Sequence, residues 1–318
     1  MMQQYLELQQ TGQFPKLLID YLAGKPELSP FYSYYPKLEN FRFLIESKEK
    51  FEPAKRKLLV EVLTEQYKDL PDAPDFSVLL DEKTFTVTTG HQLNIFGGPL
   101  YIIYKIITTI NLARLLKITY PGYNFVPVYW MATEDHDFME IASVHLFGKT
   151  FTWNTESGGP VGELDPRGLA AIAAQCPEPV GVFERAYAGN DTLTGAVRQY
   201  MHELFGKAGL ISLDAGHPSL KREFLPVIKD ELTGVKCADL VQNTSRQLNE
   251  MGYDTPVHAR EINLFYLAPR LRERIVRSGE EYQILRTGRK FTQDTILEEA
   301  EQHPGRFSPN VVLRPLYQ

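Results

Sequence analysis

The feature that most constrains the fold of this chain is a nearly continuous apolar run from Phe125 to Met131, bounded by a turn and an acidic cluster. Such a run is typical of a strand that helices cover on both faces of a parallel sheet. A second strand is predicted at Thr84 to Thr88, where β-branched and aromatic residues alternate, and Gly90 is predicted to end it. The stretch between them predicts a helix. Strand, helix and strand in this order predict the first half of a nucleotide-type α/β domain.

The intervening helix is predicted to start at Pro99, because proline suits the first helical turn. Its apolar residues recur at helical spacing, and one face is predicted to pack on the sheet. That predicted face consists of Leu100, Ile103, Tyr104, Ile107 and Ile110.

The flanking regions differ in their patterns. Residues 1–83 predict short helices that prolines separate, and residues 148–190 are rich in glycine and proline, which predicts an inserted subdomain. A helix is predicted at Thr192 to Phe205 and a strand at Leu210 to Leu213. The segment Asp214 to Pro218 then repeats the earlier arrangement of strand end, polar residue and helix start.

The C-terminal part predicts further short elements. These are a helix at Ala238 to Met251, a strand at Asn263 to Leu267 and a hairpin at Tyr282 to Phe291. The arginine-rich run Arg270 to Arg277 is interpreted as a solvated face, and Ser308 to Gln318 as a strand-like run cut inside a domain.

Composition excludes several classes of protein. The 318 residues are 43% hydrophobic and 23% charged, as in ordinary globular proteins, and the net charge of −6 disfavours nucleic acid or an anionic membrane as partner. Neither a signal-like N-terminus nor a run of roughly 18 uncharged apolar residues is present in the sequence, so a cytoplasmic location is predicted. Cys176 and Cys237 lack the spacing of metal ligands, so neither a disulfide framework nor structural zinc is predicted.

The first candidate site follows the Thr84 strand. Glycines before a helix start favour an anion such as phosphate or carboxylate, and a lysine in the second turn adds positive charge. The alternative interpretation is a tight turn in which His91 is only a capping residue. The candidates for binding substrate or nucleotide here are Thr89, Gly90, His91, Gln92, Asn94, Gly97, Gly98, Tyr101 and Lys105.

The second candidate site is the acidic cluster that follows Trp130. Glu134, Asp135 and Asp137 surround His136, and these carboxylates would repel one another unless a cation, a substrate ammonium or backbone donors compensate them. The cluster could hold an amine, accept its proton or bind a divalent metal, although the spacing is not that of a zinc motif. A solvated helix start is the alternative.

Four later residues complete the set of candidates. Asp214 ends the Leu210 strand, and Ser308, Asn310 and Arg314 flank the last apolar run. If that run joins the same sheet, Arg314 could hold a carboxylate with two hydrogen bonds, or it could form a structural ion pair.

Five segments of the chain, which include most of these candidate residues, resemble the cysteine-adding ligases of bacillithiol biosynthesis. The resemblance covers most of the chain from Thr88 onward, and its first two segments together are specific. His91 departs from it, since glutamine is expected more often there. The resembling segments are Thr88 to Ala113, Pro127 to Ile141, Leu210 to Lys221, Asn263 to Ile275 and Ser308 to Gln318.

The resemblance implies an α/β fold whose Rossmann-like parallel sheet core carries a helical N-terminal region and an inserted connective subdomain. The implied domain organisation has three parts. Residues 1–147 form the N-terminal helices and the first half of the core, residues 148–190 form the inserted connective subdomain, and residues 191–318 form the second half of the core. Family members continue into a coiled coil that forms a homodimer, so this chain is expected to be an N-terminal fragment.

The resemblance also implies an activity. The family joins the carboxyl group of L-cysteine to the amine of glucosaminyl-malate, and ATP is the simplest way to activate the carboxyl. His136 with Asp137 would then orient or deprotonate the amine, and Glu134 or Asp135 would hold an ammonium. The alternatives are a nucleotidyltransferase or adenylating enzyme with another acceptor, a non-catalytic ligand-binding or scaffold protein, and a metal-dependent hydrolase.

Overall fold

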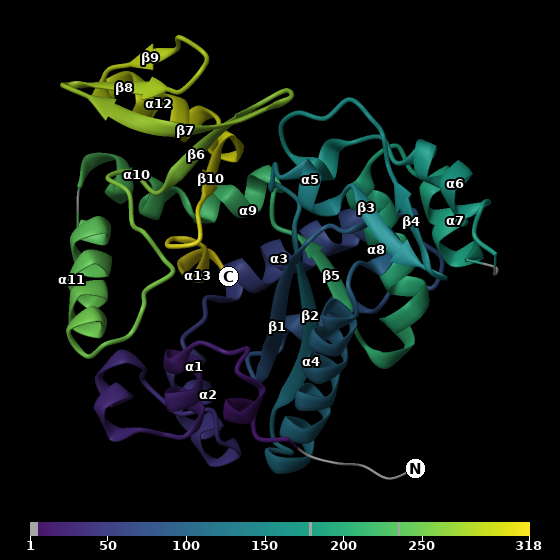
Figure 1. Cartoon of the computed structure of the whole chain (residues 1–318), viewed down its shortest axis with the longest axis horizontal. Coiled ribbons are helices and arrows are strands. Elements are labelled where there is room, and N and C mark those ends of the chain that lie inside the picture. Colours follow the sequence, from purple (N-terminus) through teal and green to yellow (C-terminus); the bar gives the residue numbers. More distant parts are fainter. Residues whose placement is uncertain (1–5, 178–179, 235) are drawn as a thin grey trace.

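A parallel sheet lies at the centre of the molecule (Figure 1). The computed structural model describes residues 6–177, 180–234 and 236–318. Strands β1 (Thr84–Gln92), β2 (Asn124–Ala132) and β5 (Ile211–Asp214) run parallel with β2 in the middle. Most of β2 is buried, as its apolar composition predicts. The predicted α/β class is therefore confirmed.

Strand β1 is longer than predicted. Gly90 does not end it, because Gly90 pairs with Trp130 and the pairing continues to Gln92. A glycine weakens a strand, but the neighbouring strand holds its backbone here. The consequence is that His91 and Gln92 belong to the sheet edge rather than to a loose turn.

Helix α4 (Leu100–Thr119) crosses between β1 and β2, and its buried face differs from the predicted one, with which it shares only Ile110. Ile102, Ile106 and Ile110 are buried, whereas Leu100 and Tyr104 are 67% and 63% exposed. The helix is apolar on nearly all sides, so residue spacing could not select the buried face.

The N-terminal region is helical, as predicted, and packs on the sheet. Tyr67 of α3 accepts a hydrogen bond from the backbone N–H of Ser212, and Arg56 donates to the carbonyl oxygens of Leu79 and Thr84. These bonds fasten α3 to β5 and to the start of β1. The elements are η1 (Leu8–Thr11), α1 (Lys16–Leu22), η2 (Pro26–Phe31), η3 (Leu38–Asn40), α2 (Phe41–Lys48), α3 (Pro53–Tyr67) and η4 (Phe76–Leu80).

The segment predicted as an insertion contributes to the main core. Trp153, Leu169 and Tyr187 belong to the same hydrophobic cluster as Ile102 and Ile106 of α4. The predicted domain boundaries at 147/148 and 190/191 are not tested by this packing and stay a prediction.

Residues 1–5, Glu178 and Pro179, which fall within predicted segments, lie outside the described residues. The elements are α5 (Phe138–Ile141), β3 (Ser143–Leu146), β4 (Lys149–Thr152), η6 (Val161–Glu163), α6 (Arg167–Ala173) and α7 (Gly181–Ala188), followed by α8 (Leu193–Phe205) and η7 (Gly206–Ala208).

A second, antiparallel sheet forms from the C-terminal part, with strand order β10-β6-β7-β8-β9 (Figure 1). The last apolar run therefore does not join the parallel sheet, because β10 pairs with β6. Beyond Pro309 this run turns into a short helix instead of remaining extended. The elements are α9 (Pro218–Glu223), α10 (Leu225–Thr233), α11 (Lys236–Glu250), β6 (Leu264–Ala268), β7 (Leu271–Ser278), β8 (Glu281–Ile284), β9 (Lys290–Phe291), α12 (Gln293–Gln302), η8 (Pro304–Arg306), β10 (Phe307–Pro309) and α13 (Arg314–Tyr317).

No helix in the described part of the chain has both the length and the apolar character needed to span a membrane.

Candidate functional site

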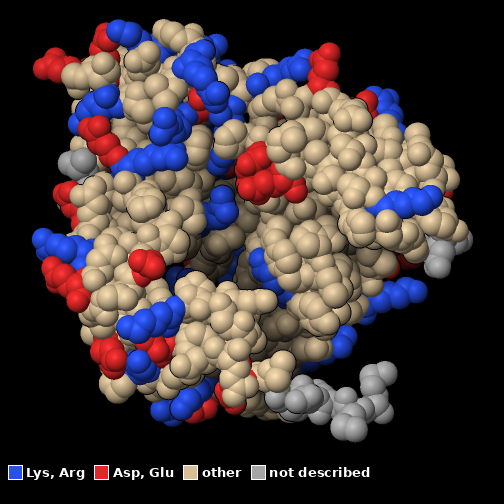
Figure 2. Space-filling view, viewed as in Figure 1, with Lys and Arg blue, Asp and Glu red and all other residues tan. Residues whose placement is uncertain are grey.

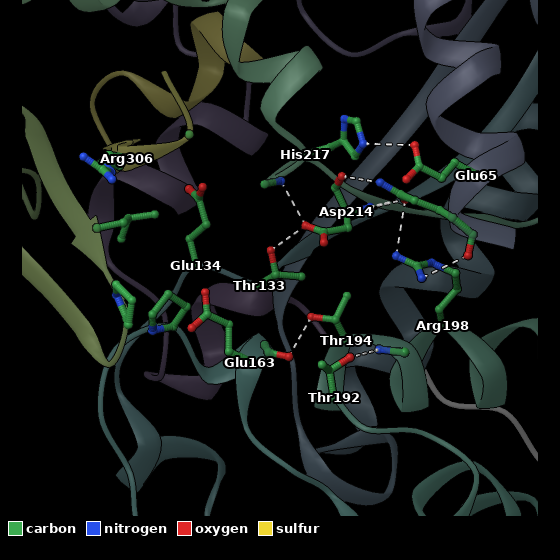
Figure 3. A pocket seen from close by; sticks show the side chains of 18 of the residues that line it. Glu65, Thr133, Glu134, Glu163, Thr192, Thr194, Arg198, Asp214, His217 and Arg306 are labelled. Atoms are coloured by element: carbon green, nitrogen blue, oxygen red, sulfur yellow. Dashed lines mark hydrogen bonds and ion pairs between the residues drawn. The ribbon is translucent and has the colours of Figure 1, made fainter. Parts of the chain in front are cut away.

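A large cavity lies at the carboxyl ends of β2 and β5 (Figure 3), and the turn between β6 and β7 contributes to its lining. Its volume is about 660 Å³, and its walls come from both sheets and from α3, η6 and α8. In open parallel sheets, ligands bind beyond the carboxyl ends of the strands. Figure 2 shows a hollow across this side of the molecule, with basic side chains in it and an acidic group on its rim.

A second, narrower cavity shares Thr133, Glu134 and Gly216 with the first one. It also includes Asp135, and it reaches towards the antiparallel sheet. The residues that it has in addition to these are Trp130, Met131, Ala132, Ala215, Arg272, Ser308, Pro309, Arg314 and Tyr317. Two carboxylates and two guanidinium groups thus face a single small space.

The two predicted loops do meet at one rim. The side-chain amide of Gln92 donates to Asp135 Oδ2 at 2.8 Å, which joins the end of β1 to the acidic cluster after β2. His91 Nε2 lies 2.8 Å from the Tyr101 hydroxyl, at the start of α4. Lys105 Nζ donates to the carbonyl oxygen of Gly90 at 2.6 Å, so this lysine stabilises the strand end.

Asp135 organises the turn after β2. Its Oδ1 accepts the backbone N–H groups of His136 at 2.7 Å and of Asp137 at 3.4 Å. Burial raises the pKa of Asp135, but the hydrogen bond from Gln92, the charge of Arg272 and these N–H groups together lower it below the ordinary value. Asp135 is therefore a stable carboxylate at neutral pH.

The protein itself supplies the positive charge that compensates Glu134. Lys221 is fully buried, and its Nζ lies 2.7 Å from Glu134 Oε1. The Ser308 hydroxyl donates to Glu134 Oε2 at 2.7 Å. Glu134 thus has a fixed counter-charge within the protein. A substrate ammonium is therefore not needed to compensate its charge, which was the reason for predicting that Glu134 binds one.

His136 is held by an arginine from β7. Arg272 Nη1 lies 2.8 Å from His136 Nδ1, and the guanidinium lies over the ring of Phe265, 3.8 Å from its centroid. A guanidinium only donates, so Nδ1 accepts and the imidazole carries its proton on Nε2. His136 consequently offers a donor to the site, which agrees with orienting a substrate better than with deprotonating an amine.

The predicted pairing of His136 with Asp137 is not formed. Asp137 is exposed at this turn, and among the described residues no hydrogen bond joins the two side chains. Asp135 accepts hydrogen bonds from the backbone N–H groups of both residues, and the His136 side chain contacts Arg272 instead of Asp137.

Asp214 lies on the floor of the large cavity. Its Oδ1 accepts the Thr133 hydroxyl at 2.6 Å and the Gly216 N–H at 2.9 Å. These bonds link the ends of β2 and β5. Asp214 thus lies at the end of β5, as predicted, and its role in binding stays a prediction.

Several other candidates have structural surroundings. Asn310 hydrogen-bonds Asn263 and supports the second sheet, and Trp130 packs edge-on against Tyr317. Thr89 is half-buried within β1. The pKa of Arg272 is lowered mainly by burial, and the positive charge of Arg314 lowers it further. Of this group, Trp130 and Arg314 line the narrow cavity.

Gly97 and Gly98 are required by the backbone at the start of α4. Both have positive φ, and a Cβ at Gly98 would lie 2.7 Å from the Asn94 Cβ and 2.6 Å from the Ile102 Cδ1. These glycines therefore allow close packing within the protein, and their approach to a ligand stays a prediction.

We expect Gly98→Ala to destabilise the fold by about 2 kcal/mol or more, since it combines a strained φ with a clash. Urea unfolding followed by circular dichroism measures this. Gly122→Ala is the matched control, because nothing lies within 4 Å of the added carbon there and its φ is not positive. Equal stabilities of the two variants would contradict this assignment.

Sequence reasoning missed Lys221, Arg272 and Glu163. Arg272 was hidden in a run interpreted as solvated, although alternation along a strand turns some side chains of such a run inward. Lys221 lies in a segment that the resemblance covers. Its partner Glu134 is 87 positions away in the sequence, so no local pattern indicates the pair. Glu163 falls in the predicted insertion, where no pattern indicates a site.

Among residues 6–177, 180–234 and 236–318, no group of three or more His, Cys, Asp or Glu side chains is arranged to hold a metal ion. Two of the carboxylates are compensated within the protein, Glu134 by Lys221 and Asp135 by Arg272 and backbone N–H groups.

The fold and the site define an α/β protein with a central parallel sheet and a polar crevice at the carboxyl ends of its strands. The chain belongs to the family described as "Bacillithiol biosynthesis BshC, N-terminal Rossmann-like domain", whose match extends over residues 1–318. The Rossmann-like fold implied by the resemblance is thereby confirmed.

Curated relatives agree with this assignment. The chain is 45% identical to a protein of Flavobacterium johnsoniae and 43% identical to one of Flavobacterium psychrophilum, in each case over 98% of this chain and 62% of the relative. A protein of Chlorobaculum tepidum is 32% identical over 83% of this chain and 51% of the relative. Each is named "Putative cysteine ligase BshC". The chain thus spans about three fifths of the length of the first two relatives.

Proposed function

We propose that this protein is the Rossmann-like part of a ligase that joins the carboxyl group of L-cysteine to the amine of glucosaminyl-malate. The observation that carries the proposal is the Gln92–Asp135 hydrogen bond of 2.8 Å, because it unites the two motifs of the family at one crevice. The names of the relatives support the reaction type.

ATP is proposed as the activating co-substrate. When bound, it would take up the oxygen that leaves the cysteine carboxyl group as the amide bond forms. Arg272 and Arg314 are the basic groups best placed for an anion, since both line the narrow cavity. Lys105 lines neither of the two cavities.

Within this proposal the residues of the chain position the reactants. The Nε2–H of His136 donates to a substrate oxygen, and Arg272 fixes the imidazole that carries it. Asp135 holds the turn in shape through its two backbone contacts. The amine loses its proton to solvent or to a carboxylate of the large cavity.

We expect His136→Ala to lower kcat/KM for the ligation by about 100-fold, because the donor that Arg272 positions is lost. Mass spectrometry of the amide product, together with assays for AMP and ADP, measures this. His145→Ala is the matched control, since His145 lies on the exposed face of β3.

The assay should compare the 318-residue chain with the full-length Flavobacterium johnsoniae relative. Activity in neither protein would contradict the ligase proposal. Release of AMP or ADP with an acceptor other than the amino sugar would favour the alternative of an adenylating enzyme. Binding of both substrates without turnover in either protein would favour a non-catalytic role.

The full-length protein is further proposed to act in the cytoplasm as a homodimer through a coiled coil. Light scattering after size-exclusion chromatography of the full-length protein tests the dimer.

A further inference from the structure

The large cavity contains charged groups that the roles above leave unused. Glu163 and Asp214 line it together with Glu134, and Arg198 and Thr194 contribute to its wall. Figure 3 shows the three carboxylate side chains grouped around the strand end that carries Thr133. Glu134 is neutralised by Lys221, whereas no ion pair of Glu163 or Asp214 is found within the described residues.

The backbone brings Glu163 to this place. Val161 donates its N–H to the Asp135 carbonyl oxygen at 2.6 Å, and Gly162 donates to that of Thr133 at 2.9 Å. A Cβ at Gly162 would lie 2.4 Å from Thr194 Oγ1, so only glycine permits this approach. Element η6 is therefore fastened to the end of β2, with Glu163 beside the carboxylates of the two strand ends.

Lys221 pairs with Glu134, but no salt bridge joins a cation to Glu163 or Asp214 among the described residues. Burial raises the pKa of Glu163, and the negative charges of Asp214 and Glu134 raise it further. A ligand with a positive charge would relieve this repulsion. The volume of about 660 Å³ is far larger than an ion needs, so an organic molecule fits better than a metal.

A second group independently indicates a ligand in this cavity. Arg198 is 9% exposed and lines the wall, and its Nη atoms donate to Gln66. Its buried Nε has no hydrogen-bond partner among the residues described. An unpaired buried donor is costly, and an acceptor oxygen of a ligand could satisfy it.

We propose that this cavity is the subsite for the primary ammonium group of a substrate, which Glu163 and Asp214 bind while Arg198 faces an acceptor oxygen of the same molecule. The proposal rests on the function proposed above and deepens it. Two substrates of that reaction carry such a group, namely the amino acid and the amino sugar. The shared chemistry is a primary ammonium next to polar oxygens.

Calorimetry on the 318-residue chain tests the subsite with four probes. These are L-cysteine, N-acetyl-L-cysteine, glucosaminyl-malate and its N-acetylated form. We expect one of the two amines to bind at least tenfold more tightly than its acetylated partner, because acetylation removes the positive charge. Which amine it is identifies the substrate.

The variants Glu163→Gln and Asp214→Asn are nearly isosteric with the native residues. Each is expected to weaken binding of the preferred amine at least tenfold and to leave its acetylated form unaffected. Glu61→Gln is the matched control, since Glu61 lies on α3 in an exposed pair with Lys57. Thermal unfolding curves establish that all variants fold.

Equal affinity for amine and acetylated forms, no binding of either amine, or unchanged binding in both carboxylate variants would overturn the subsite. These results are independent of ligation. If the amine binds as expected and no amide is ever formed, the subsite stands and the ligase proposal fails. If amide forms while both variants bind like wild type, the subsite fails and the ligase proposal stands.

Discussion

Lys221→Met is expected to lower the free energy of unfolding by about 3–5 kcal/mol, which is the effect of leaving a buried charge without its partner. Lys221 is fully buried, and the side chain of Glu134 is only 19% exposed. The lysine also donates to the carbonyl oxygen of Phe307, which joins α9 to β10. Urea unfolding followed by tryptophan fluorescence measures the change.

A double variant separates lost charge compensation from lost packing. Lys221→Met combined with Glu134→Gln should recover much of the stability, because no unpaired charge then remains. Lys57→Met is the control, since its pair with Glu61 is exposed and should contribute less than about 1 kcal/mol. A single Lys221→Met variant as stable as this control would show that the buried pair contributes little.

Arg272→Met is expected to reduce kcat/KM for the proposed ligation by about 100-fold or more, because the donor that fixes His136 is lost. Arg272→Lys should not restore the rate, since an ammonium lacks the planar group that covers Phe265. Arg274→Met is the control on the same strand, where Arg274 is exposed. Steady-state kinetics of the three variants decide the point.

The same substitution should change the pH profile. The pKa of Asp135 is lowered in the fold, so its charged form stabilises the site above the unfolded pKa, and this contribution is lost as pH falls through the folded pKa. Removing Arg272 removes part of the lowering. The acidic limb of the activity profile should therefore move to higher pH in Arg272→Met, and an unmoved limb would show that Asp135 does not need Arg272.

The predicted strand, helix and strand around Phe125 to Met131 are all present, and the two motif loops lie side by side. This was accessible from sequence because the carboxyl ends of parallel strands share one edge. The length of β1 could not be predicted from the sequence, because the pairing of Gly90 with Trp130 overrides the tendency of glycine to end a strand.

The buried face of α4 could not be predicted for a related reason. Leu100 and Ile102 are equally apolar, yet only Ile102 faces the sheet. The turn before the helix is packed closely, since a Cβ on Gly98 would lie only 2.7 Å from the Asn94 Cβ. Local pattern contains no information about that contact.

The sequence by itself determined the class of fold and the positions of its motifs, because periodicity, glycines and strand ends are local properties. Only the tertiary structure decided which charges meet. Lys221, Arg272 and Glu163 come from three separate segments, and each reaches the end of β2 through contacts made after the chain has folded. Electrostatic partners depend on distance in space, and spacing along the chain does not record that distance.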